Sequence, residues 1–313
     1  VVIFDEASQL RMEDSLGSIF RAKQIIVFGD EQQLPPTRFF EAMDSGGDYD
    51  EEADQVAEAL DYESILTRAE GEPQAFRQVD LRWHYRSRHE ELIAFSNKNF
   101  YNNRLFTFPN SEQSLSSKAV HFVYVPGGVY DRGRSRTNPN EAYRVAEACL
   151  DYAREHPTWS LGVVTFSESQ RRMIEDNIER MLQENPDLRT FFAEDREGGE
   201  PFMVKNLELI QGDERDAIFF SFGYGKDATG AFTQNFGPLN QEAGRRRLNV
   251  AVTRARHLVY LFASIQPEDL TSDALGVRLM KEYMTLARDG LAALFGSPAT
   301  GQSPTTIGYL AHQ

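Results

Sequence analysis

The chain has 313 residues, with 33 Lys and Arg against 48 Asp and Glu, so its net charge is −15. This length suggests about two domains with ample core, and 41% hydrophobic with 26% charged residues is an ordinary globular composition. The sequence contains no apolar run near the roughly 20 residues that span a bilayer, so we expect no membrane partner. Its single cysteine, Cys149, excludes an internal disulfide and a Cys-rich zinc site. We therefore expect a reducing, cytoplasmic compartment, and association with the nucleoid is left open.

Two short apolar stretches, residues 1–4 and 25–28, have the pattern of buried strands. The first is followed at once by Asp5 and Glu6, and an apolar strand that ends in two carboxylates can hold Mg²⁺ and orient a water toward a phosphoryl group. Acidic strand ends are also common by chance. Since a core strand needs neighbouring strands, we expect this chain to be a piece of a longer polypeptide.

The acidic charge is concentrated in one segment. Residues 41–63 contain ten Asp and Glu and no Lys or Arg, so the other 290 residues carry a net charge of only −5. The segment also contains Ser45, Gly46 and Gly47, which are typical of a loop. It is either a solvated surface loop or a segment that repels or mimics nucleic acid. The net charge of the whole chain therefore does not exclude a nucleic-acid partner.

Strand and helix patterns alternate through the rest of the chain. We expect strands at residues 120–125, 161–165, 202–210, 217–222 and 258–262, and helices at 140–156, 174–182, 242–256 and 273–289. This alternation favours an α/β fold with a mainly parallel sheet, and such sheets place ligands at the carboxyl ends of their strands. We expect the residues of interest to lie there. The Gly, Ser and Pro residues after about 290 indicate a linker or tail.

Two stretches of the first half of the chain carry side chains suited to phosphate chemistry. Residues 28–37 run from a strand end through Gly29 and a polar loop into Pro35 and Pro36, and two prolines make a loop stiff. Residues 81–89 place three arginines among aromatic side chains, which suits phosphate contact or stacking on bases. Read alone, the first could equally be a plain turn and the second a solvated basic surface.

Two more such stretches lie in the second half. Residues 211–216 follow an expected strand and combine Gly212, which lets a backbone approach a ligand, with carboxylates that can accept hydrogen bonds from ribose hydroxyls. Residues 245–256 place five arginines in twelve residues on an expected helix, and guanidinium groups pair well with phosphate oxygens. A polar loop and a charged helix face are the alternative interpretations.

In their order and spacing these stretches resemble the conserved motifs of superfamily 1 helicases. The resembling segments are DEAS at residues 5–8 (motif II, the Walker B box), GDEQQLPP at 29–36 (motif III), HYRSRH at 84–89 (motif IV), QGDERD at 211–216 (motif V) and RRLNVAVTRAR at 246–256 (motif VI). Five ordered motifs make the resemblance specific. QLPP and RRLNVAVTRAR resemble the branch of the up-frameshift RNA-decay helicase and its bacterial DNA-helicase relatives, whereas HYRS departs from the QYRM that is usual in that branch.

The resemblance implies a fold of P-loop NTPase type, a motor of two RecA-like domains, each a parallel sheet flanked by helices, with ATP bound between them. Residues 1–80 would be the remnant of the first domain, residues 81–290 the second domain, and residues 291–313 a tail or linker. The phosphate-binding (Walker A) loop of the family, G-x-x-x-x-G-K-[ST], does not occur in this sequence. We expect it in an upstream part of the same polypeptide, and we expect the chain alone not to hydrolyse ATP.

The resemblance also implies roles for individual residues. In catalysis with ATP and Mg²⁺, Asp5 would hold the metal, Glu6 would activate the attacking water, Gln33 would sense the γ-phosphate, and Arg86 and Arg254 would be arginine fingers. Tyr85, Gly212 and Glu214 would contact the bound ATP. The residues implied to contact nucleic acid are Pro35, Pro36, Thr37, Thr165, Phe166, Asn249 and Thr253. The last two are four apart and would share one face of the expected helix.

The function implied is that of the carboxyl-terminal motor part of an ATP-dependent helicase or translocase, which couples ATP hydrolysis to movement on single-stranded DNA or RNA. We favour DNA over RNA and movement from 5′ to 3′. The alternative is a non-catalytic module, derived from a helicase fold, that binds nucleic acid or another partner. A nuclease that uses Asp5 and Glu6 is a third hypothesis, and it lacks a cluster of ligands at convincing spacing.

Overall fold

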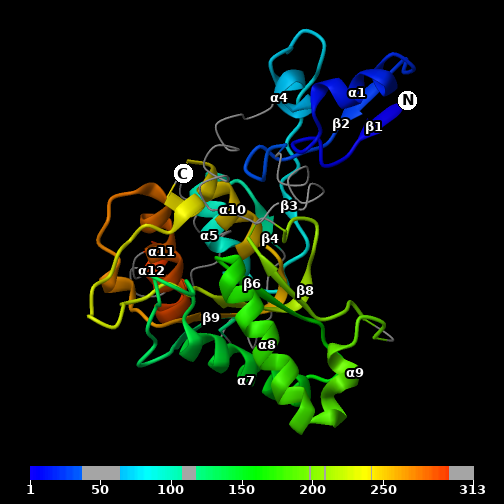
Figure 1. The fold of residues 1–313 in the computed structure, drawn as a ribbon. Helices are drawn as coiled ribbons and strands as arrows, with labels where there is room; N and C mark the ends of the chain where they lie inside the picture. Colours follow the sequence, from blue (N-terminus) through cyan, green and yellow to red (C-terminus); the bar gives the residue numbers. More distant parts are fainter. Residues whose placement is uncertain (37–63, 108–117, 197–198, 208, 241, 296–313) are drawn as a thin grey trace, which may run out of the picture. The chain divides into compact units, whose positions relative to one another are not determined.

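The computed structural model describes residues 1–36, 64–107, 118–196, 199–207, 209–240 and 242–295 (Figure 1). The chain divides into two compact units, residues 1–81 together with 237–250, and residues 82–236 together with those from 251 onward. Thr37, the acidic segment 41–63 and most of the expected tail lie outside the described residues. Within the described ranges, none of the helices has both the length and the apolar character that crossing a bilayer requires.

The first unit is built on a two-stranded parallel sheet. Strand β1 (Val2–Phe4) pairs with β2 (Ile25–Val27), so both expected strands are confirmed. Two helices that the sequence analysis did not predict, α1 (Met12–Ile19) and α4 (Ile65–Glu70), belong to the same unit. Its small core contains Phe4, Ala7, Ile65 and Leu66, and α4 begins where the Ser64 side chain accepts a hydrogen bond from the amide of Thr67 at 3.0 Å.

The second unit contains a five-stranded sheet in the order β5-β9-β8-β6-β7, in which every neighbouring pair of strands is parallel. The strands are β5 (Val120–Tyr124), β6 (Leu161–Thr165), β7 (Met203–Asn206), β8 (Arg215–Ser221) and β9 (Ala255–Ala263). All five expected strands are therefore confirmed, although β7 ends at Asn206, short of the expected end at residue 210. The parallel sheet flanked by helices confirms the predicted fold class.

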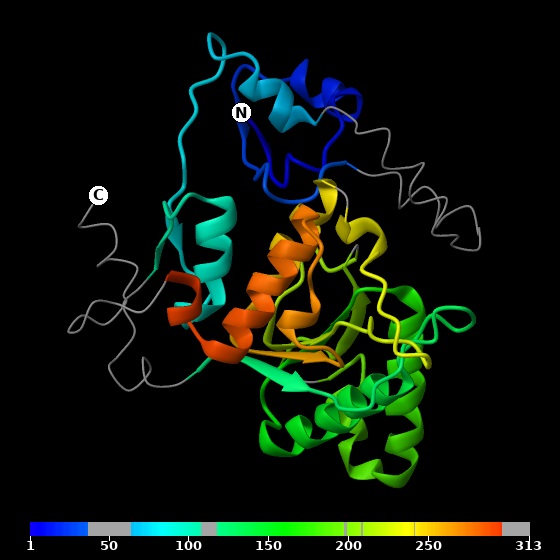
Figure 2. The same ribbon diagram turned by 90° about the vertical axis from the view of Figure 1, so that its left-hand side faces the viewer.

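Helices cover both faces of this sheet (Figure 2). Helices α7 (Pro139–Glu155) and α8 (Glu168–Glu184) pack on one face, and α5 (Glu91–Phe100) and α11 (Leu275–Asp289) on the other. The shorter elements are β3 (Trp83–His84), which pairs with β4 (Phe106–Thr107), the helices α9 (Arg189–Phe192), α10 (Glu242–Val252) and α12 (Ala292–Phe295), and the 3₁₀-helices η1 (Pro186–Leu188), η2 (Gly237–Asn240) and η3 (Pro267–Asp269).

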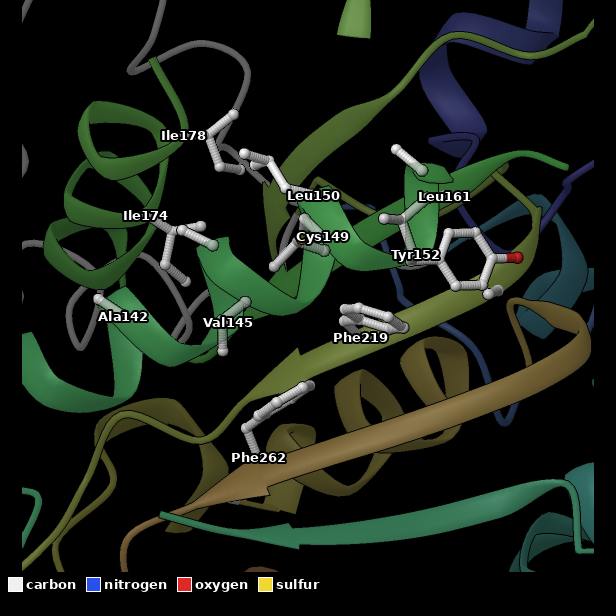
Figure 3. Close-up of a cluster of buried hydrophobic side chains, with 14 of the residues drawn as sticks. Ala142, Val145, Cys149, Leu150, Tyr152, Leu161, Ile174, Ile178, Phe219 and Phe262 are labelled. Atoms are coloured by element: carbon white, nitrogen blue, oxygen red, sulfur yellow. The ribbon is translucent and has the colours of Figure 1, made fainter. Parts of the chain in front are cut away.

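A hydrophobic core lies between the sheet and the α7–α8 pair (Figure 3). Helix α7 begins at Pro139, with the Asn138 side chain accepting from the amide of Glu141, so a capping residue and a proline in the first turn define its start. Its apolar face then recurs at helical spacing through Val145 and Cys149 and packs against strand residues such as Phe219. The single cysteine is fully buried.

The helix expected at residues 242–256 is too long. Helix α10 ends at Val252 and strand β9 begins at Ala255, so Thr253 and Arg254 lie in the turn and Arg256 lies on the strand. The reason is that residues 250–256 contain no glycine or proline, the residues that usually mark the end of a helix in a sequence. The region expected to be a tail from residue 291 also begins with a short helix, α12.

A buried carboxylate, Glu141 of α7, connects three elements at the carboxyl edge of the sheet. Its Oε1 accepts from Ser221 Oγ at 2.8 Å and from the Gly223 amide at 2.7 Å, and its Oε2 accepts from Ser264 Oγ at 3.1 Å. The side chain is fully buried, and burial raises the pKa of this carboxyl to about 7, although the hydrogen bonds oppose the rise.

We expect Glu141→Gln to change how stability depends on pH. Because the folded-state pKa is about 7 and the ordinary value is 4.5, this group stabilises the fold fully below about pH 4.5, and the contribution is lost as pH rises through 7. The loss corresponds to about 3 kcal/mol. A glutamine side chain does not titrate in this range. The free energy of unfolding, measured with urea between about pH 5 and 8, should therefore decline less with rising pH for Glu141→Gln than for wild type. Glu147→Gln, a partly exposed acid of the same helix, is the matched control, and parallel curves for Glu141→Gln and wild type would contradict the assignment.

Candidate functional site

In the first unit, the expected Walker B acids follow β1 and the motif III loop follows β2. Both therefore lie at the carboxyl edge of the two-stranded parallel sheet. Asp5 and Glu6 are exposed, and the Glu6 amide donates to Asp5 Oδ1 at 3.0 Å. Glu6 has φ +50°, a left-handed conformation that is uncommon for glutamate. The amide of Ala7 donates to the carbonyl of Phe28 at 2.8 Å, which ties this turn to the end of β2.

Asp5 has the chemistry that one ligand of a nucleotide-bound Mg²⁺ requires. In such sites the metal is held by one or two carboxylates together with water and phosphate oxygens. Asp5 offers an exposed carboxylate at the end of a strand, next to Glu6. Across the described part of the chain, no three His, Cys, Asp or Glu side chains form a group that could hold a metal ion.

The motif III loop is held by its own aspartate. Asp30 Oδ1 accepts from the Gln32 amide at 2.9 Å, and Oδ2 accepts from Gln33 Nε2 at 3.1 Å, so Asp30 orients the expected γ-phosphate sensor. A Cβ at Gly29 would lie 2.8 Å from Leu66 Cδ2, which explains the glycine as a point of close approach. Farther along the loop, Pro35 is half-buried and Pro36 is buried.

Motif VI contacts motif III within the first unit. Arg245 Nη2 donates to Gln32 Oε1 at 3.0 Å, and Asn249 Nδ2 donates to the Gln32 carbonyl at 2.9 Å. These two side chains are four apart on α10 and share a face. The partner that the sequence analysis assigned to that face, Thr253, lies beyond the end of the helix, and its Oγ1 accepts from Arg254 Nη2 at 2.9 Å. The contact through Gln32, rather than Gln33, was not predicted.

In the second unit, motif IV forms a small closed turn. The His84 ring nitrogen Nε2 accepts from the Ser87 amide at 3.2 Å, and the turn leaves Tyr85 76% exposed. Burial and the positive charges of Arg86 and Arg254 lower the pKa of His84 to about 4, so the imidazole is neutral at pH 7. Because both arginines act on one imidazole, the two expected arginine fingers lie close to the same point. Arg254 is only 3% exposed.

An ion-pair network joins motifs IV, V and VI. Arg86 Nε donates to Glu214 Oε2 at 2.7 Å, and Arg256 Nη1 lies 3.2 Å from Glu214 Oε1. Arg256 also pairs with both oxygens of Glu200, at 2.6 and 2.7 Å, and with Asp216 Oδ1 at 3.0 Å. The pairing with Arg86 lowers the pKa of Glu214. Glu214, expected to contact ATP, is therefore shared between two arginines.

Glu200 is a residue of this network that the sequence analysis missed. It belongs to none of the five motifs, and a single acid after two glycines carries no signal of spacing or pattern. Its pairing with Arg256 lowers the pKa of its carboxyl to about 2, so it stays ionised at neutral pH. Glu200 thus holds the guanidinium that in turn contacts Glu214.

The motif residues of the second unit lie at two opposite edges of the sheet. Gly212 and Glu214 precede β8 and Arg254 precedes β9, so they lie at the amino edge, and the expectation that they lie at the carboxyl ends of the strands is wrong. The expectation assumed that each motif follows a strand, whereas these motifs precede their strands. Gly212 has φ +85° and open space at its Cβ position, so backbone conformation rather than crowding requires glycine there.

Thr165 is the last residue of β6 and Phe166 follows it, so both lie at the carboxyl edge, where residues of interest were expected. Thr165 is fully buried, and its Oγ1 donates to the carbonyl of Ser167 at 2.9 Å. The Phe166 ring packs edge-on against Phe222, with centroids 5.2 Å apart. Contact of these two residues with nucleic acid stays a prediction.

Comparisons with known proteins give the family. A family model described as an AAA domain matches residues 62–266. The chain is 33% identical over 293 residues to the uncharacterized ATP-dependent helicase MG140 of Mycoplasma genitalium, covering 90% of this chain and 25% of that protein. It is 27% identical to helicase sen1 of Schizosaccharomyces pombe, covering 91% of this chain and 16% of that protein. It is 26% identical to the regulator of nonsense transcripts 1 homolog of Arabidopsis thaliana, covering 98% and 23%.

The chain thus spans a quarter or less of the length of these relatives. The family model matches well over half of the chain and includes motifs IV, V and VI. The chain therefore belongs to this AAA-domain family, among the superfamily 1 helicases.

Proposed function

We propose that this chain is the carboxyl-terminal motor part of an ATP-dependent helicase or translocase that moves on single-stranded nucleic acid. The observation that supports the proposal is the cluster of Arg86, Glu214, Arg254 and Arg256, which gathers three motifs that are up to about 170 residues apart in the sequence. Guanidinium groups held next to one carboxylate suit the binding of phosphate oxygens. The Mycoplasma relative is also named as an ATP-dependent helicase, which supports the proposal.

In this proposal the residues of the first unit act on ATP. Asp5 holds Mg²⁺, which neutralises charge on the phosphate oxygens, Glu6 takes the proton of the attacking water, and Gln33, oriented by Asp30, senses the γ-phosphate. The Walker A loop comes from an upstream part of the same polypeptide. We propose residues 1–80 as the remainder of a first RecA-like domain.

The residues of the second unit act on the same nucleotide. Arg86 and Arg254 stabilise the charge that develops on the transferred phosphoryl group, Tyr85 offers an exposed ring for stacking on the base, and Gly212 with Glu214 contacts the sugar and phosphates. Residues 81–290 form the second RecA-like domain and 291–313 a tail or linker. The compartment is cytoplasmic.

We propose that single-stranded nucleic acid, with DNA favoured over RNA, is the track of the motor. The residues assigned to it are Pro35, Pro36, Thr37, Thr165, Phe166, Asn249 and Thr253. Of these, Pro35 is half-buried within the motif III loop, and Phe166 is partly buried at the carboxyl edge of the second sheet.

The test is ATP hydrolysis by the complete polypeptide with and without single strands. We expect Glu6→Gln to lower the stimulated kcat by about 10²–10⁴, because the general base is lost, with little change in the KM for ATP. Glu13→Gln, an exposed acid of α1, is the matched control. The 313-residue chain alone should show negligible turnover.

Two results would contradict the proposal, the first its motor activity and the second only the role of Glu6. If the complete polypeptide binds single strands but hydrolyses no ATP, the non-catalytic module becomes the better account. If Glu6→Gln turns over as fast as wild type, the motor stands and the role of Glu6 is wrong.

A further inference from the structure

A basic loop lies outside all five helicase motifs. The loop between β5 and α7 carries Arg132, Arg134 and Arg136 within five residues, and all three side chains are exposed. Between residues 126 and 137 the only acid is Asp131, so the loop has a net charge of +2 in a chain whose total is −15. Alternation of arginine with small or flexible residues gave no helix or strand pattern, and the sequence analysis passed over it.

The loop is closed on itself. The Asp131 amide donates to the Thr137 carbonyl at 2.9 Å, and the Arg136 amide donates to the Asp131 carbonyl at 2.8 Å. At its end Thr137 is 3% exposed and Asn138 is fully buried, where Asn138 Nδ2 donates to Ser264 Oγ at 2.8 Å. The backbone of the loop is therefore already ordered before a ligand binds, which favours affinity.

The acids around the loop have partners of their own. Asp131 Oδ2 accepts from the Ser135 amide at 3.2 Å, and Asp269 pairs with Lys226 at 2.9 Å. Asp227 accepts from the Thr229 hydroxyl at 2.6 Å, and this hydrogen bond, with a smaller contribution from the charge of Arg132, lowers the pKa of Asp227. These contacts engage the carboxylates locally, and Arg132 Nη1 donates to Thr233 Oγ1 at 2.5 Å, so Arg132 is held in place while the loop keeps its net positive charge.

The place of the loop in the fold indicates its ligand. It leads into the amino terminus of α7, a helix of 17 residues whose dipole adds positive potential there. That terminus lies at the carboxyl edge of the sheet, the edge that also carries Thr165 and Phe166. We propose that Arg132, Arg134 and Arg136 bind the phosphate backbone of single-stranded nucleic acid. This rests on the proposed function and extends it by three residues.

The test measures binding of the 313-residue chain to fluorescent 20-nucleotide strands of DNA and of RNA by anisotropy, from roughly 20 to 200 mM salt. We expect the triple variant Arg132→Ala, Arg134→Ala, Arg136→Ala to bind at least about tenfold more weakly at low salt. The slope of log K against log salt should become shallower by about 2, since each lost phosphate contact on a single strand accounts for about 0.7. Both strands should lose affinity alike.

The control variant removes the same charge from helices α7, α8 and α9. Arg154→Ala, Arg180→Ala, Arg189→Ala changes α7, α8 and α9 away from the carboxyl edge, and it should bind like wild type. The triple lysine variant of the loop keeps the charge and should bind nearly as well as wild type. The single Arg134→Glu variant checks the result if the triple alanine variant does not fold, and it should weaken binding several-fold.

Three outcomes would overturn the inference. Wild-type binding by the triple alanine variant or by Arg134→Glu, or an equal loss in the control variant, would show that the loop is not the site while leaving the motor in place. A loss confined to DNA or to RNA would exclude the phosphate backbone as the ligand. If the wild-type chain binds neither strand at low salt, the loop inference and the nucleic-acid part of the proposed function fail together.

Discussion

Arg86→Ala should lower the kcat of the complete polypeptide for ATP hydrolysis by about 10³-fold or more, with the KM for ATP changed only a few-fold. An arginine that meets the phosphoryl group only as charge develops contributes to the transition state and little to ground-state binding. In the second unit Arg86 is held by Glu214 at 2.7 Å and has a side chain 29% exposed, so its guanidinium is ordered yet open to solvent. Steady-state kinetics with saturating single strands measure the effect.

The control for this prediction lies two residues away. Arg88 is exposed and carries the same charge, and Arg88→Ala should leave kcat within about twofold of wild type because the proposal assigns the phosphoryl contact to Arg86 and not to Arg88. Arg86→Lys should recover little of the rate, since an ammonium cannot reproduce the planar fork of a guanidinium. Equal kcat values for Arg86→Ala and Arg88→Ala would remove Arg86 from the catalytic assignment.

The elements that the sequence predicted best are those whose burial is uniform. Strand β6 has the bounds that were expected, because its five residues are all buried and read as one apolar run. Helix α4 has only six residues and is capped by Ser64, so it offers less than two turns of periodicity. The boundary between α10 and β9 was not predicted for a different reason. Arginine and small apolar residues occur in helices and in strands alike, so they do not mark where one ends and the other begins.

In the candidate site, too, some features could be predicted from the sequence and others could not. The motif residues were named from their order, and the structure shows how Arg86, Glu214 and Arg256 come together. The sequence could not predict the contact of Glu200 with Arg256 or that of Arg245 with Gln32. Each contact joins segments that are far apart in the chain, and no sequence pattern links them. The same holds for the edges of the sheet, because a motif that precedes its strand looks in the sequence much like one that follows the previous strand.

A buried carboxylate at the start of α5 secures that helix to the sheet. Glu91 is 3% exposed, and its Oε2 accepts from the amides of Ala119 and Val120 at 2.6 and 3.0 Å. Those amides lie at the beginning of β5, an outer strand of the sheet. Both residues are buried, at 2% and 0% exposed, so water has little access to their N–H groups.

We therefore expect Glu91→Ala to lower the free energy of unfolding of the second unit by about 3–5 kcal/mol. Each buried amide left without an acceptor costs about 1–3 kcal/mol, and the lost side chain leaves a cavity. Glu91→Gln keeps a carbonyl oxygen that can accept from both amides, so it should cost only about 1 kcal/mol. Urea unfolding followed by circular dichroism measures both, with Glu179→Ala on the exposed face of α8 as the control. If Glu91→Ala is as stable as Glu179→Ala, the two amides must find other acceptors, and the Glu91 carboxylate is not what holds α5 to β5.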